Sequence, residues 1–257
     1  DINIPTKKSK KRKFLILLYQ WIIFIPIFAI TTIILGFSAI LGCKFGNPNF
    51  WGYYPGVLWS RINLAIALCP IKVEGRENLD SKQSYVFVAN HQGATDILML
   101  FGYLGQPFRW MLRQGIKKAP VLGPFCENSG QIWVDESGAK GIIHTVRQAL
   151  SVLKDGKSMV IFPEGTRSKD GQLHAFKKGA FAIAAMIKLP VVPVTLINSY
   201  QTMPKGSISI RPHRLKLIIG KPIPAVTKDE GNEAGIERLM RESRATIESV
   251  LNEQTSK

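Results

Sequence analysis

A histidine and an aspartate five residues apart, His91 and Asp96, have the residue types that acid–base catalysis needs. An imidazole can take a proton from a hydroxyl group near neutral pH, and a carboxylate can orient the imidazole and balance its charge. The pair directly follows residues 85–89, a short apolar run typical of a strand buried in a parallel sheet. Because catalytic groups in open α/β folds lie at the carboxyl ends of such strands, this position predicts a general base with its orienting partner.

A second polar loop follows residues 158–162, which also form a predicted strand. It carries Glu164, Thr166 and Arg167 around a turn at Gly165. The planar guanidinium of an arginine suits phosphate or carboxylate, and a glycine turn can expose backbone N–H groups to an anion. We therefore expect this loop to bind an anion at the same edge of the sheet as the histidine, with its N–H groups as candidate donors to an oxyanion.

Lys177 precedes residues 179–187, an almost uncharged segment that is predicted to form a buried helix. The N-terminus of a helix favours anions, so Lys177 is a further candidate for the anion site. Lys178 beside it has the same position, and a solvated basic edge formed by both lysines is the alternative interpretation. Three widely spaced cysteines indicate neither a disulfide framework nor a metal site, and they fit a reducing compartment.

Alternating strand and helix patterns predict an α/β fold, with a single mixed, largely parallel sheet flanked by helices. Pro193 interrupts one predicted strand and suggests a bulge or a position at the edge of the sheet. The predicted strands are residues 71–75, 85–89, 108–112, 131–134, 158–162, 191–197, 207–210 and 215–219, and the predicted helices are residues 97–103, 139–154, 179–187 and 232–252.

The N-terminal part of the chain predicts a membrane anchor. Residues 1–13 are polybasic, residues 14–43 carry no charge, and residues 50–69 are apolar with a single arginine. As one helix, the uncharged run would reach about 45 Å, which exceeds a bilayer core of about 30 Å, so we expect tilt, a kink at Pro26 or a break near Gly36. We interpret residues 14–70 as a membrane-anchoring helical hairpin ahead of a catalytic domain at residues 71–257. A cleaved signal peptide and a buried hairpin of a soluble protein are the alternatives.

The net charge of +16 would attract anionic lipids, nucleic acid or acidic proteins. No aromatic RNA-binding signature accompanies the basic residues, so nucleic acid is not an expected partner. The polybasic start favours a cytoplasmic N-terminus, and we expect a location in the cell inner membrane with the catalytic domain on the cytoplasmic face. A membrane-anchored basic protein without catalysis would explain the charge, but it would leave the histidine and glutamate at the strand ends without a role.

Four motifs in order resemble those of the glycerolipid acyltransferases, the family of bacterial 1-acylglycerol-3-phosphate acyltransferase. The pattern N-H-x-x-x-x-D matches Asn90 to Asp96, and F-P-E-G-T-R-S matches Phe162 to Ser168 without a change. The pattern F-K-x-G matches Phe176 to Gly179, and a Pro-x-x-Pro-Val element matches Pro190 to Val194. The resemblance spans about residues 85–222, which is over half of the chain.

This resemblance implies that His91 is the general base for an acceptor hydroxyl and that Asp96 holds its imidazole. The acceptor oxygen would then attack an acyl thioester of acyl carrier protein or coenzyme A, without an acyl-enzyme intermediate, a cofactor or a metal. Arg167 would bind the headgroup of a lyso-lipid acceptor together with Glu164, Gly165 and Thr166. Arg113 is expected to add a second phosphate contact.

Residues 130–135 match a further motif of the family, which usually ends in Asp-Arg, but Glu136 stands in the position of that arginine. A carboxylate there would repel a phosphate dianion unless Arg113, Arg167 or Lys177 compensates. The resemblance itself implies 1-acylglycerol-3-phosphate as acceptor, with phosphatidic acid as product, whereas Glu136 argues against an acceptor that carries a phosphate. A lyso-lipid with an amino-acid or zwitterionic headgroup stays open as the alternative.

Overall fold

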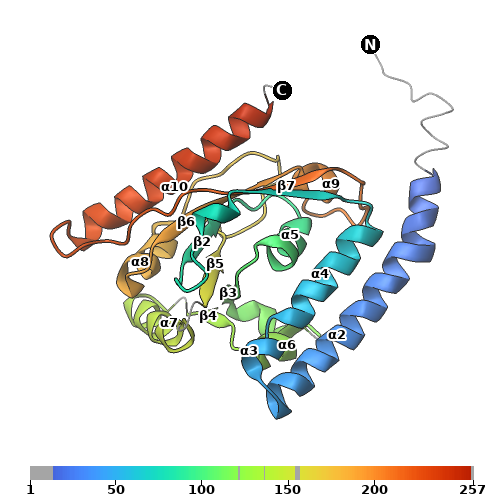
Figure 1. Cartoon of the computed structure of the whole chain (residues 1–257), viewed down its shortest axis with the longest axis horizontal. Coiled ribbons are helices and arrows are strands. Elements are labelled where there is room, and N and C mark those ends of the chain that lie inside the picture. Colours follow the sequence, from blue (N-terminus) through green and yellow to red (C-terminus); the bar gives the residue numbers. More distant parts are fainter. Residues whose placement is uncertain (1–13, 121, 136, 154–156, 256–257) are drawn as a thin grey trace.

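The computed structural model describes residues 14–120, 122–135, 137–153 and 157–255. Within these ranges, seven strands form one sheet with helices on both faces (Figure 1). The strands are β1 (Ile71–Glu74), β2 (Val86–Ala89), β3 (Phe108–Arg113), β4 (Ile132–Val134), β5 (Ser158–Ile161), β6 (Val191–Ile197) and β7 (Leu215–Ile219). The longer helices are α2 (Ile25–Phe45), α4 (Tyr54–Ile66), α5 (Thr95–Tyr103), α6 (Leu122–Asn128), α7 (Ala139–Val152), α8 (Lys178–Ile187) and α10 (Asn232–Thr255), and the short ones are η1 (Gln20–Phe24), α3 (Pro48–Trp51), η2 (Arg76–Asn78), η3 (Gln114–Lys118) and α9 (Ser199–Thr202).

The strands lie in the order β1-β7-β6-β2-β5-β3-β4. Neighbouring strands are parallel except β6 and β7, which are antiparallel. This arrangement confirms the predicted mixed, largely parallel sheet. Every residue of β2, β5 and β6 is buried, as expected for strands that are covered on both faces.

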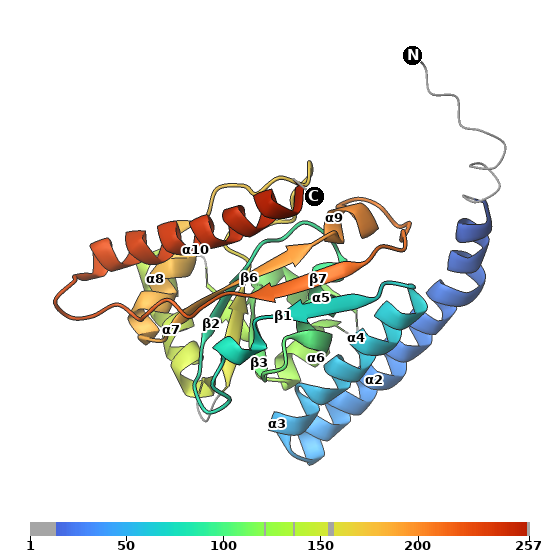
Figure 2. The same ribbon diagram turned by 45° about the horizontal axis from the view of Figure 1, so that its top comes forward.

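Two apolar layers hold the sheet between its helices. On one face, Phe87 and Val192 pack with α4 and α5, and on the other face Val88 and Val191 pack with α7, α8 and α10. Figure 2 shows α10 lying across the sheet on the side of α8, opposite the pair α2 and α4. The two layers make the domain an α/β/α sandwich with the sheet at its centre.

The position of the site follows from the way in which β2 and β5 continue. These strands are parallel neighbours, but the chain leaves β2 for α5 on one face and leaves β5 for α8 on the other face. Departure to opposite faces opens a crevice at the carboxyl ends of the two strands, which is where open α/β sheets bind ligands. The two loops that were expected to meet at one sheet edge do so.

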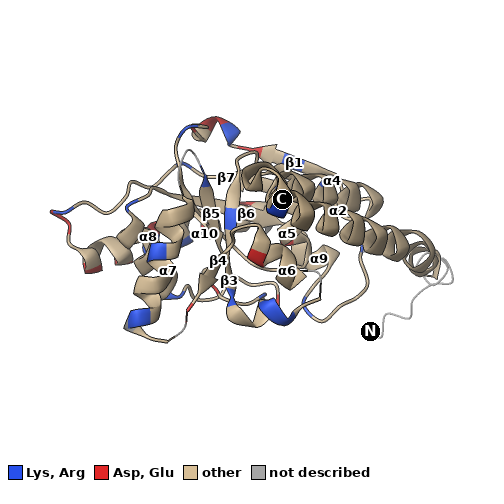
Figure 3. Cartoon of the chain, turned by 90° about the horizontal axis from the view of Figure 1, so that it is seen from below, with Lys and Arg blue, Asp and Glu red and all other residues tan. Residues whose placement is uncertain are grey.

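The N-terminal apolar segment forms a helix over residues 14–45, long and apolar enough to cross a membrane. The helix continues through Pro26 and Gly36, so the break that was one of the expectations near Gly36 is absent. Its hydrogen bonding widens to a π-helix in η1, which ends two residues before Pro26. Proline lacks an N–H donor and crowds the preceding turn, so a wider turn there is physically reasonable. Helix α2 carries Lys44 as its single charged residue and is almost free of charge colour in Figure 3.

The second arm of the expected hairpin, α4, lies beside α2 (Figures 1 and 2). It also packs closely against α5, and Ser60, Asn63 and Leu64 of α4 are buried. The second arm therefore packs against the body of the α/β fold as well as against α2. The exposed apolar surface lies mainly on the first arm.

One further expectation is wrong, and of the two alternatives expected for Pro193 only the irregular pairing is found. Residues 207–210 are not a strand, because their backbone bonds with Gln20 and with their own serine side chains instead of a sheet neighbour. Pro193 lies in the interior strand β6, not at an edge. The pairing opposite it is nevertheless irregular: Val194 pairs with Ile219 and Val191 with Ile223, so the partner segment has one extra residue.

Candidate active site

The imidazole of His91 and the carboxylate of Asp96 meet at the end of β2, where Nδ1 lies 2.8 Å from Oδ2. Asp96 lies in the first turn of α5 and has no exposed surface. Its Oδ2 also accepts the backbone N–H groups of Gln92 at 2.8 Å and Gly93 at 2.9 Å. The carboxylate is thus fixed by the loop that carries the histidine, and it occupies Nδ1 so that Nε2 is the nitrogen left for a substrate.

An aromatic stack fixes the plane of the imidazole. The ring of Phe162 lies against His91 with centroids 3.8 Å apart and an angle of 12° between the planes. Trp110 stacks behind Phe162 at 5.7 Å. Phe162 follows β5 and Trp110 belongs to β3, so two other strands of the sheet support the base.

Asn90 attaches the loop that carries His91 to β6. Its side-chain amide donates to the backbone oxygen of Leu196 at 2.9 Å and accepts from the backbone N–H of the same residue at 2.8 Å. Asn90 is fully buried, so these bonds continue the ladder between β2 and β6 beyond the end of β2. These two bonds fix the position of Asn90, and they thereby fix the point at which the next residue, His91, leaves the sheet.

Glu164 differs from its expected role at the acceptor. It is 5% exposed, and it is not among the described residues that line the two pockets at His91. Its carboxylate accepts the backbone N–H of His91 at 2.8 Å and that of His174 at 3.1 Å. Burial raises the pKa of Glu164, and the two N–H bonds oppose this rise. The side chain therefore acts as a brace between the two strand-end loops.

Four cationic side chains gather in a pocket of about 580 Å³ on one side of His91: Arg113, Arg167, Lys177 and Lys205. The expected anion-binding residues Arg113, Thr166, Arg167 and Lys177 are brought together there, with Gly165 between them. Lys205 was not among the residues predicted from the sequence, because it lies on a turn before β7 and not in a strand-end loop. Lys178 instead forms ion pairs with Glu233 and Glu237 on α10.

Gly165 makes room for this cluster. Its φ of +72° is a conformation that favours glycine, and a Cβ atom there would lie 2.9 Å from Nζ of Lys177 and 3.3 Å from Nη2 of Arg113. The backbone N–H of Gly165 donates to the oxygen of Phe162 at 3.0 Å. This N–H group is therefore engaged in the turn, so the expected oxyanion donor has to be another group beside Gly165.

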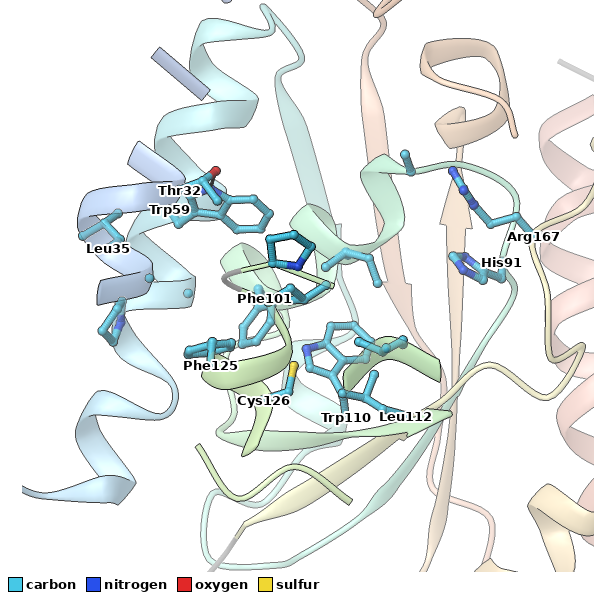
Figure 4. Close-up of a pocket in the computed structure, with 18 residues that line it drawn as sticks. Thr32, Leu35, Trp59, His91, Phe101, Trp110, Leu112, Phe125, Cys126 and Arg167 are labelled. Atoms are coloured by element: carbon cyan, nitrogen blue, oxygen red, sulfur yellow. Dashed lines mark hydrogen bonds between the residues drawn. The ribbon is translucent and has the colours of Figure 1, made fainter. Parts of the chain in front are cut away.

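A second pocket, of about 530 Å³, shares His91 and Arg167 with the first and extends to the N-terminal helices. Figure 4 shows His91 and Arg167 at one end, Phe101 and Trp110 along the pocket, and Leu35 of α2 at the far end. The lining is dominated by apolar side chains. The histidine therefore stands at the junction of a cationic pocket and an apolar pocket.

Among the residues that the structure describes, no group of three or more His, Cys, Asp or Glu side chains could hold a metal ion. The three cysteines are buried and unpaired. Asp135, the last described residue of the motif at residues 130–135, lines the cationic pocket. Glu136, whose position raised the question of the acceptor headgroup, lies outside the described residues.

Comparison with known proteins places this geometry in a family. Residues 70–197 match the family model described as Acyltransferase. The chain is 37% identical over 192 residues to the chloroplastic 1-acyl-sn-glycerol-3-phosphate acyltransferase of Arabidopsis thaliana, an alignment covering 74% of this chain and 51% of that protein. It is 37% identical over 169 residues to the 1-acyl-sn-glycerol-3-phosphate acyltransferase of Saccharomyces cerevisiae, covering 63% of this chain and 55% of the relative. The chain thus spans about half the length of these relatives.

A solved structure shares the fold. The 1-acyl-sn-glycerophosphate acyltransferase PlsC from Thermotoga maritima superposes with a TM-score of 0.71 over 92% of this chain and 97% of that chain, at 21% identity. The family model covers β1 to β6, including the loops that carry His91, Asp96 and Arg167. The strand-end dyad, the intact second loop and these likenesses lead to one conclusion: the chain belongs to the glycerolipid acyltransferase family.

Proposed function

We propose that the protein is an O-acyltransferase that moves a fatty acyl group from a thioester to the free hydroxyl of 1-acylglycerol-3-phosphate. The observation that carries this proposal is the position of His91 between a cationic pocket and an apolar pocket. In 1-acylglycerol-3-phosphate, the reacting hydroxyl lies between a phosphate group and a fatty acyl chain, which would match the cationic and the apolar pocket. The names of the relatives support the same acceptor.

In this mechanism, Nε2 of His91 removes the proton of the acceptor hydroxyl as its oxygen attacks the carbonyl carbon of the thioester. Asp96 balances the charge of the imidazolium, and the phosphate lies among Arg113, Arg167 and Lys177. When the tetrahedral intermediate collapses, the C–S bond breaks and the thiolate takes the proton from His91. One ester and one thiol result, and no acyl-enzyme forms.

The donor is an acyl thioester of acyl carrier protein or coenzyme A, and the acyl chain is assigned to the apolar pocket. The balanced reaction needs no redox step and no group carrier in the enzyme. We therefore expect full activity after treatment with a metal chelator.

The site of action in this proposal is a membrane surface. The long helix over residues 14–45 supports it, since its apolar side chains are mostly exposed. The polybasic residues 1–13 favour the cytoplasmic side of a cell inner membrane, which protease accessibility in sealed membranes would test.

The direct test is acyl transfer by the purified protein in lipid vesicles, with lysophosphatidate and radiolabelled acyl thioesters of both carriers. Phosphatidate should form with the unmodified protein, and His91→Ala should lower kcat at least about 100-fold, since a positioned base contributes roughly that factor or more. Equal turnover by both proteins would refute the assignment of the base. A panel of lyso-lipids with zwitterionic or amino-acid headgroups would show whether another acceptor is preferred.

A further inference from the structure

We propose that Lys205 is a specificity-determining residue that binds the anionic headgroup of the acceptor. This inference deepens the proposed function and rests on it. Lys205 lies on the turn between α9 and β7, and its Nζ donates to Oγ1 of Thr166 at 2.8 Å. Its side chain lines the cationic pocket from a segment that is separate in sequence from both strand-end loops.

The charge of Lys205 remains available to a ligand. Its described hydrogen bond is to a hydroxyl group, whereas Lys178, on the outer side of the same region, is neutralised by Glu233 and Glu237. The described residues that line the pocket include four cations and one acid, Asp135, which gives 4 − 1 = +3. A phosphate monoester carries about −2 charges at neutral pH, so the pocket has a surplus of positive charge suited to such a group.

The turn that carries Lys205 is held against the catalytic loop. Pro204 forms a β-bridge with Gly93, and the backbone oxygen of Met203 accepts the N–H of Ala94 at 3.0 Å. Gly93 in turn donates its N–H to Asp96. The position of Lys205 is therefore set relative to the dyad by backbone bonds, which is what a headgroup contact in register with the base requires.

The far end of the same loop is attached to the N-terminal helix. Gln20, only 1% exposed, donates through Nε2 to the oxygen of Ile208 at 2.6 Å and accepts through Oε1 from the N–H of Ile210 at 3.1 Å. Ile208 itself is 71% exposed, next to a helix whose apolar side chains are also exposed. Lys205 is thus three residues from the exposed apolar side chain of Ile208. A cation at this height beside an apolar surface is well placed to bind the phosphate of a lipid headgroup.

This location favours the acceptor lipid over the phosphates of a soluble coenzyme A donor. We infer that Gln20 is a positioning residue, which acts on the acceptor through the loop that carries Lys205. Both inferences concern acceptor binding, so their effect should appear in KM for the acceptor and not in kcat.

The experiment compares Lys205→Met, Lys205→Arg and the unmodified protein in vesicles, with lysophosphatidate or the neutral monoacylglycerol as acceptor. The matched control is Lys82→Ala, because Lys82 is exposed and lies before the amino end of β2, whereas the two pockets lie at the carboxyl ends of the strands. Lys205→Met should raise KM for lysophosphatidate about five- to tenfold with little change in kcat, because one charge-assisted bond is lost. Lys205→Arg should restore KM, and both monoacylglycerol kinetics and Lys82→Ala should be unaffected.

Three results would overturn the proposal. An unchanged KM for lysophosphatidate would remove Lys205 from the acceptor site. A rise confined to KM for acyl-coenzyme A, absent with acyl carrier protein, would assign the contact to the donor. An equal loss with the neutral acceptor would indicate a structural role. If the unmodified protein forms no product with any acceptor, the proposed function itself fails, which is a separate outcome.

A double-mutant cycle tests the role of Gln20. Gln20→Leu should raise KM for lysophosphatidate when Lys205 is present and should add little in the Lys205→Met background. Additive effects of the two substitutions would overturn the coupling, and thermal melting of each variant shows that the fold is retained.

Discussion

At the scale of residues, the imidazole of His91 is held by neighbours that act on different parts of it. Asp96 binds one ring nitrogen, Phe162 covers one face, and Glu164 holds the backbone N–H. None of these contacts occupies Nε2. The result is a base whose orientation is fixed before the substrate arrives, so little of the binding energy is needed to align it.

Asp96→Asn should lower kcat about 100-fold or more while leaving KM for the acceptor nearly unchanged, because the charge that stabilises the imidazolium is removed and the pockets are not. Steady-state kinetics with lysophosphatidate measures both constants. A fall in kcat of less than about threefold would show that the carboxylate has no catalytic part. Circular dichroism checks that the buried loop keeps its fold.

Glu164 predicts a specific dependence of stability on pH. Its folded pKa lies above the ordinary value of 4.5, so the folded protein binds more protons than the unfolded chain in the window above pH 4.5. The free energy of unfolding should therefore fall as pH rises through this window. Glu164→Gln should abolish this component, which chemical denaturation of both proteins across pH 4 to 8 would measure. A difference that grows in favour of the unmodified protein with rising pH would contradict the assignment.

The sequence was sufficient to predict that His91, Asp96 and Arg167 lie close together, because all three belong to the segments that follow two neighbouring strands. It did not predict the contacts of Glu164, since a carboxylate in a polar loop gives no sign of whether it faces solvent or a backbone N–H group. It also missed Lys205 and Gln20. A single glutamine in an apolar run was the available signal for Gln20, but its partners lie 188 and 190 residues away.

At the scale of elements, the active site is a property of three adjacent strands. The proposed base follows β2, the loop proposed to bind the anion follows β5, and β6 bonds to the side chain of Asn90. Since β2 lies between the other two, its catalytic loop is held from both sides. The hydrophobic pattern predicted these strands well, because buried strands are short and apolar.

Asn90→Ala should destabilise the protein by about 1–3 kcal/mol, because it leaves the buried N–H and oxygen of Leu196 without their partners. The free energy of unfolding from urea denaturation measures this loss. Asn78→Ala provides a control, since its amide makes one bond to Ile219 in a less buried place. Equal losses of unfolding free energy in the two variants would show that the two bonds of Asn90 stabilise the protein no more than the single bond of Asn78.

The error at residues 207–210 has a physical cause. Their alternation of serine and isoleucine has the period of a half-buried strand, but they do not pair with any strand of the sheet. The partner that binds their backbone is the side chain of Gln20, which only the tertiary fold supplies. Pro193 similarly sits in an interior strand because the register shift opposite it relieves the missing N–H.

At the scale of the whole molecule, the exposed apolar face of the N-terminal helix and the apolar pocket belong together. Leu35 and Thr32 line the pocket, while Ile34 and Phe37 of the same helix face outward. One helix thus borders both the cavity assigned to the acyl chain and the surface assigned to the bilayer. A fatty chain would have a short apolar path between them.

Replacing Ile34 and Phe37 together by lysine should reduce binding to phospholipid vesicles about tenfold or more, because two large apolar side chains, each worth roughly 1.5–3 kcal/mol when buried, are lost and charge is added. Vesicle flotation measures the bound fraction. Leu150→Lys, at an exposed apolar position on α7, is the control and should bind like the unmodified protein. Equal flotation of all three proteins would exclude this helix as the membrane contact.

The long sequence separation of the bonds around His91 has a consequence for biosynthesis. Glu164 is 73 residues, and Leu196 is 106 residues, beyond the partners that they hold in the catalytic loop. During translation the apolar helix over residues 14–45 is synthesised long before those residues, and chains generally fold from their N-terminal side as they emerge from the ribosome. In a nascent chain the imidazole would therefore stay unbraced until β5 and β6 have both been synthesised, so the proposed base could not be oriented before residue 196 has emerged.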